Sequence, residues 1–167
     1  MSNKDEAIMK IESFLTSDHT GLLLTGSNQY EKHRLVMALL EKNFSGAHIL
    51  FRINSMQNIP DPAFLGWVGI RKPPKSGQAL KIGHNYYEFD SLFNQGTWNK
   101  TSQKFDFAIC YPIDALAAKK DCKPVEELYE WKQIEKVFLC SWYDRVGDGY
   151  SFLDEYYDQH VTYDLEV

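Results

Sequence analysis

The sequence predicts an α/β fold, a three-layer sandwich in which helices cover both faces of a mainly parallel central sheet of about five strands. Two observations support this prediction. Residues 21–53 read as strand, loop, helix and strand, which is the order of a βαβ unit with a parallel strand pair. Further along the chain, short apolar runs again alternate with segments of helical periodicity.

Length and composition narrow the class of protein. A chain of 167 residues suits one domain with a substantial core, and we expect 1–167 to form a single α/β domain. The 18 basic and 23 acidic residues give a net charge of −5, which argues against a general nucleic-acid binder. No apolar run approaches the about 20 residues of a membrane helix, and the polar N-terminus lacks a signal-peptide pattern. We therefore expect a cytoplasmic protein that contacts no membrane.

The first third of the chain supplies the βαβ unit. Apolar residues at helical spacing predict amphipathic helices, and short continuous apolar runs are typical of buried strands. The expected elements are a helix at 4–15, a strand at 21–25, a helix from 31 or 32 to about 43–46, and a strand at 48–53.

The middle of the chain, 55–104, has a different composition. It contains four of the six prolines and many glycines. Within it, 79–82 and 86–89 flank Gly83-His84-Asn85, which predicts a β-hairpin with a three-residue turn. We interpret 55–104 as an insertion or lid that contains this hairpin.

Regular alternation then resumes. The expected elements are strands at 105–111, 136–142 and 161–165, short helices at 112–120 and 124–133, and a last helix at 149–157. Together with 21–25 and 48–53, these strands make up the predicted sheet.

The loop between the first strand and the second helix has the layout of a phosphate-binding loop. In such a loop, backbone N–H groups hold the anion, a Lys reaches the outer phosphates, and a Ser or Thr hydroxyl holds magnesium. The pattern requires Gly, Lys and Ser or Thr where this chain has Glu31, Lys32 and His33. Glu31 adds a negative charge beside the anion, and His33 offers magnesium no oxygen ligand.

This unit, with its Gly26-x4-Glu31-Lys32-His33 loop, resembles the P-loop NTPase family as a degenerate member. The resemblance rests on about 35 residues and the later strand order, and only Gly26 and Lys32 match the motif. It implies a P-loop-NTPase-like core in which Lys32 is the phosphate lysine and the amides of 27–32 form the cradle. The ligand it implies is ATP or GTP with magnesium, or another phosphate. The cofactor-binding residues that follow from it are Gly26, Ser27, Asn28, Lys32 and His33.

The family also needs an acid at the C-terminal end of a later strand. The strand at 105–111 ends on Cys110-Tyr111 and is followed by Pro112, so no carboxylate stands there. Asp114 and Asp144 follow the strands at 105–111 and 136–142, and they are weak candidates for the magnesium acid. The simpler interpretation is a helix-start acid for Asp114 and a solvated acid for Asp144. The five histidines are dispersed, so we expect no further metal site.

These features favour a non-hydrolytic binding or interaction protein without catalytic residues. Its ligand would be a protein partner or a phosphate-bearing molecule at the loop 26–33, with 55–104 supplying specificity. Two alternatives stay open. One is an active ATP- or GTP-binding NTPase that uses Asp114 or Asp144 as the magnesium acid, and the other is a structural subunit of a larger assembly.

Overall fold

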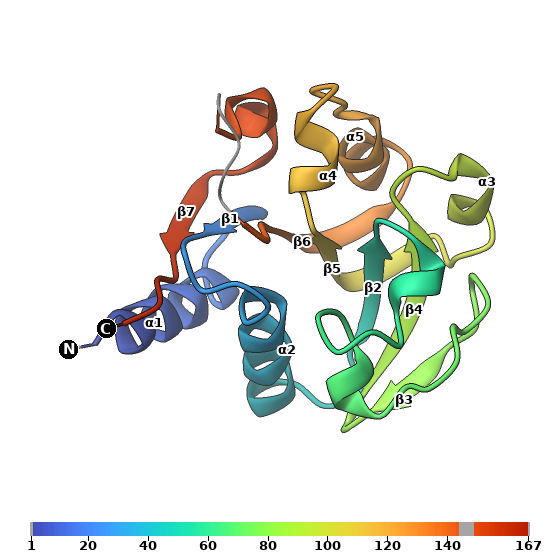
Figure 1. The fold of residues 1–167 in the computed structure, drawn as a ribbon, viewed down its shortest axis with the longest axis horizontal. Helices are drawn as coiled ribbons and strands as arrows, with labels where there is room; N and C mark the ends of the chain where they lie inside the picture. The colour runs from blue at the N-terminus through green and yellow to red at the C-terminus, as the bar shows by residue number, and fades with distance from the viewer. Residues whose placement is uncertain (1, 144–148, 167) are drawn as a thin grey trace.

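In a computed structural model, which describes residues 2–143 and 149–166, the described strands form one seven-stranded sheet (Figure 1). Their order across the sheet is β3-β4-β2-β5-β6-β1-β7. β3 runs antiparallel to β4, and all other neighbours are parallel. The strands are β1 (Gly21–Thr25), β2 (His48–Ile53), β3 (Leu80–Ile82), β4 (Asn85–Ser91), β5 (Lys104–Tyr111), β6 (Gln133–Cys140) and β7 (Gln159–Thr162).

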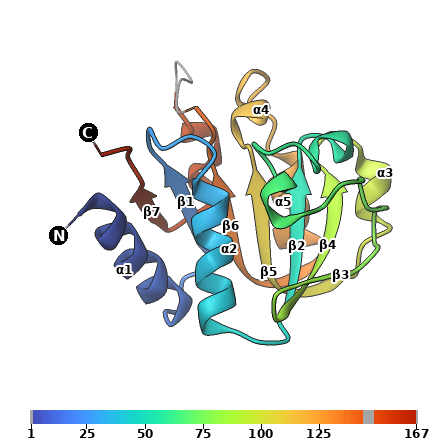
Figure 2. The ribbon, with the colours of Figure 1, turned by 60° about the horizontal axis from the view of Figure 1, so that its bottom comes forward.

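Helices cover both faces of the sheet, as Figures 1 and 2 show. One face carries α1 (Asn3–Leu15) and α2 (Lys32–Asn43), and the other carries α4 (Asp114–Ala117), α5 (Lys123–Glu130) and the 3₁₀ helix η3 (Ser151–Tyr156). Because successive strand residues point to opposite faces, Leu22 and Leu24 belong to the first core cluster and Leu23 to the second. The predicted three-layer α/β arrangement is therefore confirmed.

The predicted number of strands was wrong, because the hairpin belongs to the sheet. β4 pairs in parallel with β2 from His48↔Tyr86 to Ile53↔Ser91. The prolines and glycines of 55–104 predicted an insertion, whereas Glu88 and Asp90 of β4 contact the neighbouring strand β2. Both side chains are buried, because Glu88 pairs with His48 and Asp90 pairs with Arg52 on the neighbouring strand.

The C-terminal elements also differ from the prediction. The helix expected at 149–157 is the short 3₁₀ helix η3. The strand expected at 161–165 is β7, which begins two residues earlier and ends three residues earlier. The carboxylate of Asp158, between η3 and β7, accepts a hydrogen bond from the Gly21 amide at 3.2 Å. This contact fixes the start of β7 beside β1, before the apolar positions from which the strand was predicted.

Candidate functional site

The loop 26–31 leaves the carboxyl end of β1 and leads into α2, at the edge of a parallel sheet where ligands of such folds bind. Gly26 has a φ of +126°, and a Cβ placed on it would lie 2.2 Å from the Tyr163 carbonyl oxygen. A side chain at this position would therefore collide with the segment that follows β7. The sequence predicted a glycine turn here. The structure shows that the position requires glycine both for its positive φ and for the close approach of Tyr163.

Lys32, the predicted phosphate lysine, is fully buried at the first position of α2. Its Nζ donates hydrogen bonds to the carbonyl oxygens of Asn28, at 3.1 Å, and Trp142, at 3.3 Å. The ammonium group thus connects the loop to the segment that follows β6, and it is solvated by backbone carbonyls of the chain itself.

Several amides of the predicted cradle are also engaged within the chain. The Ser27 amide donates to a carboxylate oxygen of Asp164 at 3.0 Å, and the Asn28 amide donates to the Tyr163 carbonyl at 3.2 Å. The Gln29 amide donates to the Ser27 carbonyl at 3.0 Å. In the reverse direction, the Leu165 amide donates to the Ser27 hydroxyl at 3.0 Å. The Asp164 carboxylate is thus hydrogen-bonded to the Ser27 amide, which the P-loop resemblance assigns to a bound phosphate.

His33 stands where the motif has a hydroxyl, and its side chain is fully buried in the core. Its ring stacks on Tyr111 at a centroid distance of 4.1 Å, and its Nε2 is hydrogen-bonded to the Phe64 carbonyl. Burial lowers the pKa of His33 to about 4, so the imidazole is neutral at pH 7 and donates that bond. His33 therefore attaches the segment around Phe64 to α2 and β5.

Of the two candidate magnesium acids, Asp114 is bonded to backbone amides of the chain itself. Both carboxylate oxygens of Asp114 accept backbone hydrogen bonds, from the Trp142 amide at 2.7 Å and the Tyr143 amide at 2.9 Å. Asp114 thus connects the start of α4 to the end of β6. Asp144 lies outside the described residues. Tyr111 and Pro112 stand at the end of β5, which β6 separates from β1.

Aromatic side chains surround the loop at the same edge of the sheet. Tyr30, Trp67 and Tyr143 are 38%, 38% and 39% exposed, and we call them the edge aromatic surface. Trp142 connects two of them, with ring centroids 5.9 Å from Tyr30 and 4.6 Å from Tyr143. The Trp67 indole N–H donates to the Phe64 carbonyl at 2.6 Å. Sequence reasoning missed this surface; the only signal was that aromatic residues occur inside a polar loop and a proline-rich segment.

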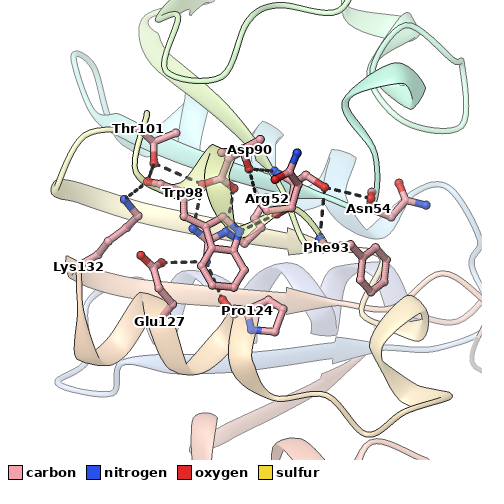
Figure 3. Close-up of polar contacts among 12 residues, drawn as sticks. Arg52, Asn54, Asp90, Phe93, Trp98, Thr101, Pro124, Glu127 and Lys132 are labelled. Carbon is pink, nitrogen blue, oxygen red and sulfur yellow. Dashed lines mark hydrogen bonds and ion pairs between the residues drawn. The ribbon is translucent and has the colours of Figure 1, made fainter.

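A second group of buried polar side chains, which we call the polar centre, lies between the sheet and α5 (Figure 3). Arg52 is fully buried, and its Nε and Nη2 donate to the two carboxylate oxygens of Asp90, each at 2.8 Å. Its Nη1 donates to the Pro124 carbonyl at 2.7 Å and lies 3.0 Å from a carboxylate oxygen of Glu127. The guanidinium carbon lies 4.5 Å from the ring centroid of Trp98.

The surroundings of Arg52 keep its guanidinium charged. Burial by itself lowers the pKa of Arg52, but the hydrogen bonds and the charge of Asp90 outweigh it, so the pKa is raised. Sequence reasoning missed the centre, although an arginine inside the apolar strand His48–Ile53 was a signal that a buried acid would face it.

No family model and no curated protein matches this sequence. Among solved structures, the chain is similar to the large terminase of the thermophilic bacteriophage D6E, with a TM-score of 0.59 and 10% identity. The match covers 96% of this chain and 45% of the terminase chain, so this chain spans less than half of that protein's length. This likeness shows the fold alone.

Two further findings concern the described residues only. Across 2–143 and 149–166, His, Cys, Asp and Glu side chains do not come together in groups of three or more that could hold a metal ion. None of the helices within these ranges has both the length and the apolar character needed to cross a membrane.

Proposed function

We propose that this chain is a P-loop-like protein that binds a protein partner and does not hydrolyse nucleotide. The observation that carries the proposal is the state of the loop. Lys32 Nζ is bonded to two backbone carbonyls, and the Ser27 amide is bonded to the Asp164 carboxylate. A phosphate would have to displace these contacts before it could bind the Ser27 amide or the Lys32 ammonium group.

Charge also works against a bound phosphate. Glu31 precedes Lys32, and the carboxylate of Asp164 accepts a hydrogen bond from the Ser27 amide. Two like charges about 4 Å apart repel by about 4 kcal/mol at the effective dielectric of a protein surface. Arg34 offsets part of the charge of Glu31, since the two form an ion pair at 3.3 Å. The neutral, buried His33 supplies no hydroxyl for magnesium.

The edge aromatic surface supports the protein-binding part of the proposal. Partly exposed Tyr and Trp side chains are enriched at protein interfaces, and Arg is frequent among the residues that dominate binding energy. Arg34 lies over Trp67, with its guanidinium carbon 4.7 Å from the ring centroid. Tyr30, near the end of the loop, has a φ of +63° and is partly exposed. The segment 59–68, held by His33, contributes Trp67 to this surface.

Nucleotide binding is the first test, and we expect none. Thermal unfolding with and without ATP or GTP, each with and without magnesium, should give the same midpoint. A nucleotide at 100 times its Kd would add about 2.7 kcal/mol, which raises the midpoint of a domain of this size by about 5–10 °C. A magnesium-dependent rise of that size, lost in Lys32→Met, would favour the active NTPase that uses Asp114 or Asp144.

Partner binding is the second test, and it depends on the edge aromatic surface. We expect Tyr30→Ser and Trp67→Ser to weaken capture of a partner by about ten-fold or more, because a central aromatic contact contributes about 2 kcal/mol. The matched control is Trp131→Ser, since Trp131 is 69% exposed and lies at the end of α5. Quantitative affinity capture from cell extract compares the variants. Equal loss with Trp131→Ser, or no loss with Trp67→Ser, would contradict the proposal.

A further inference from the structure

A hollow of about 530 Å³ lies between α3 (Gln95–Trp98), α4 and the start of α5. Leu92 and Phe93, which directly follow β4, form one wall, and Ala115 and Ala118 of the α4 segment form another. The hollow therefore lies beside the carboxyl ends of β4 and β5, separate from the loop 26–31. Its volume falls in the range of small-molecule sites, about 300–1,000 Å³, and the carboxyl edge is where open α/β sheets bind ligands.

The wall between this hollow and the core is held rigidly by the polar centre of Figure 3. Pro124 lines the hollow and accepts a hydrogen bond from Arg52, and Trp98 lines it and covers the same guanidinium. The Trp98 indole N–H donates to the Ser91 carbonyl at 2.6 Å. A wall fixed in this way is preorganised, so a ligand would lose little free energy in ordering it.

The side chains around the hollow define the chemistry of its ligand. Lys119 and Lys123 contribute two ammonium groups, against one carboxylate from Asp121. That carboxylate also accepts a hydrogen bond from the Lys123 amide at 3.0 Å. Phe93, 55% exposed, offers an aromatic face at the same hollow. Two cations beside an apolar, aromatic wall complement an anionic group attached to a flat ring.

We propose that this hollow is a binding site for a small organic anion that has a flat apolar ring. The ring packs between Phe93 and the apolar wall, and the anionic group lies toward Lys119. An adjacent hollow of about 220 Å³ shares Lys123 but is lined by Glu126 and Glu127. Glu127 is paired with Arg52, but the carboxylate of Glu126 repels an anion, and this sets the orientation of the ligand.

The test uses 8-anilinonaphthalene-1-sulfonate as the probe, followed by fluorescence on the full chain. We expect saturable binding at one site. Lys119→Glu combined with Lys123→Glu should weaken it by about ten-fold or more, the equivalent of about 1.4 kcal/mol. The same double charge change at Lys4 and Lys10, on the opposite face of the sheet, is the matched control and should change the affinity less than about two-fold.

A second probe separates the charge from the apolar contact. N-phenyl-1-naphthylamine has the same rings without the sulfonate, and the Lys119 and Lys123 changes should leave its affinity within about two-fold. Ala115→Trp, which fills the hollow, should weaken both probes. Unchanged sulfonate binding in the Lys119 and Lys123 variant, or equal weakening in the Lys4 and Lys10 variant, would overturn the proposal. Melting curves of each variant confirm that binding is measured on folded protein.

Discussion

Replacing Arg52 by Met is expected to lower the free energy of unfolding by about 3–5 kcal/mol, the largest effect of any single substitution considered for this protein. The substitution leaves Asp90 buried without its cation, and it leaves the Pro124 carbonyl without its donor. A buried carboxylate that has lost its partner keeps its full desolvation penalty. Urea unfolding followed by circular dichroism measures the change.

A matched control isolates burial as the cause. Arg34→Met removes the same side chain from an ion pair with Glu31 in which both partners are more than a third exposed. It should cost about 1 kcal/mol or less, since solvent screens exposed pairs and the stacking on Trp67 is weak. If the two substitutions cost the same, the Arg52 centre would not be the desolvated pair described above.

The pairing itself is tested by a double-mutant cycle. Arg52→Met and Asp90→Leu together should cost less than the sum of the two single changes, because the double variant leaves neither of these two fully buried charges without the other. A coupling free energy of about 2 kcal/mol is expected. Additive effects would instead mean that each side chain is stabilised mainly by other contacts, such as the Thr101 hydroxyl for Asp90.

The local sequence pattern predicted the first βαβ unit correctly. The helix predicted from residue 31 or 32 to about 43–46 is α2 (Lys32–Asn43), and the strands predicted at 21–25 and 48–53 are β1 and β2. These elements have apolar residues at their own repeat, so they can be found without knowledge of what packs against them. The same approach found β4 as one half of a hairpin at 86–89 but not its place in the central sheet, because that place depends on buried pairs with His48 and Arg52 of another strand.

In the candidate site, too, positions were predicted from local pattern, whereas contacts between distant segments were not. Gly26 and Lys32 were placed at the strand end and the helix start by spacing alone, and their roles in ligand binding stay predictions. Their contacts with Tyr163 and Trp142 depend on which strands flank β1, and hydrophobic periodicity does not encode the strand order. The burial of His33 likewise requires the segment around Phe64, which has no regular repeat from which its position could be predicted.

Replacing His33 by Thr restores the residue type of the phosphate-loop motif, yet we expect it to destabilise the protein by about 2–4 kcal/mol. The change removes a fully buried ring that stacks on Tyr111, and it removes the hydrogen bond to the Phe64 carbonyl. Thr is too small to fill that volume. The exposed His84→Thr is the control, and it should cost about 1 kcal/mol or less.

The pH dependence distinguishes loss of the buried imidazole from a general packing defect. The pKa of His33 is about 4 in the folded protein and 6.5 in the unfolded chain, so the unfolded state binds more protons between these values. The contribution of the neutral His33 to the free energy of unfolding is complete above about pH 6.5. It falls by about 3 kcal/mol as the pH drops to about 4. His33→Thr should therefore lose most stability at pH 7 and much less at pH 4. An equal loss at both values in urea unfolding would show that His33 is not held neutral in the core, and the docking of the segment around Phe64 would need another explanation.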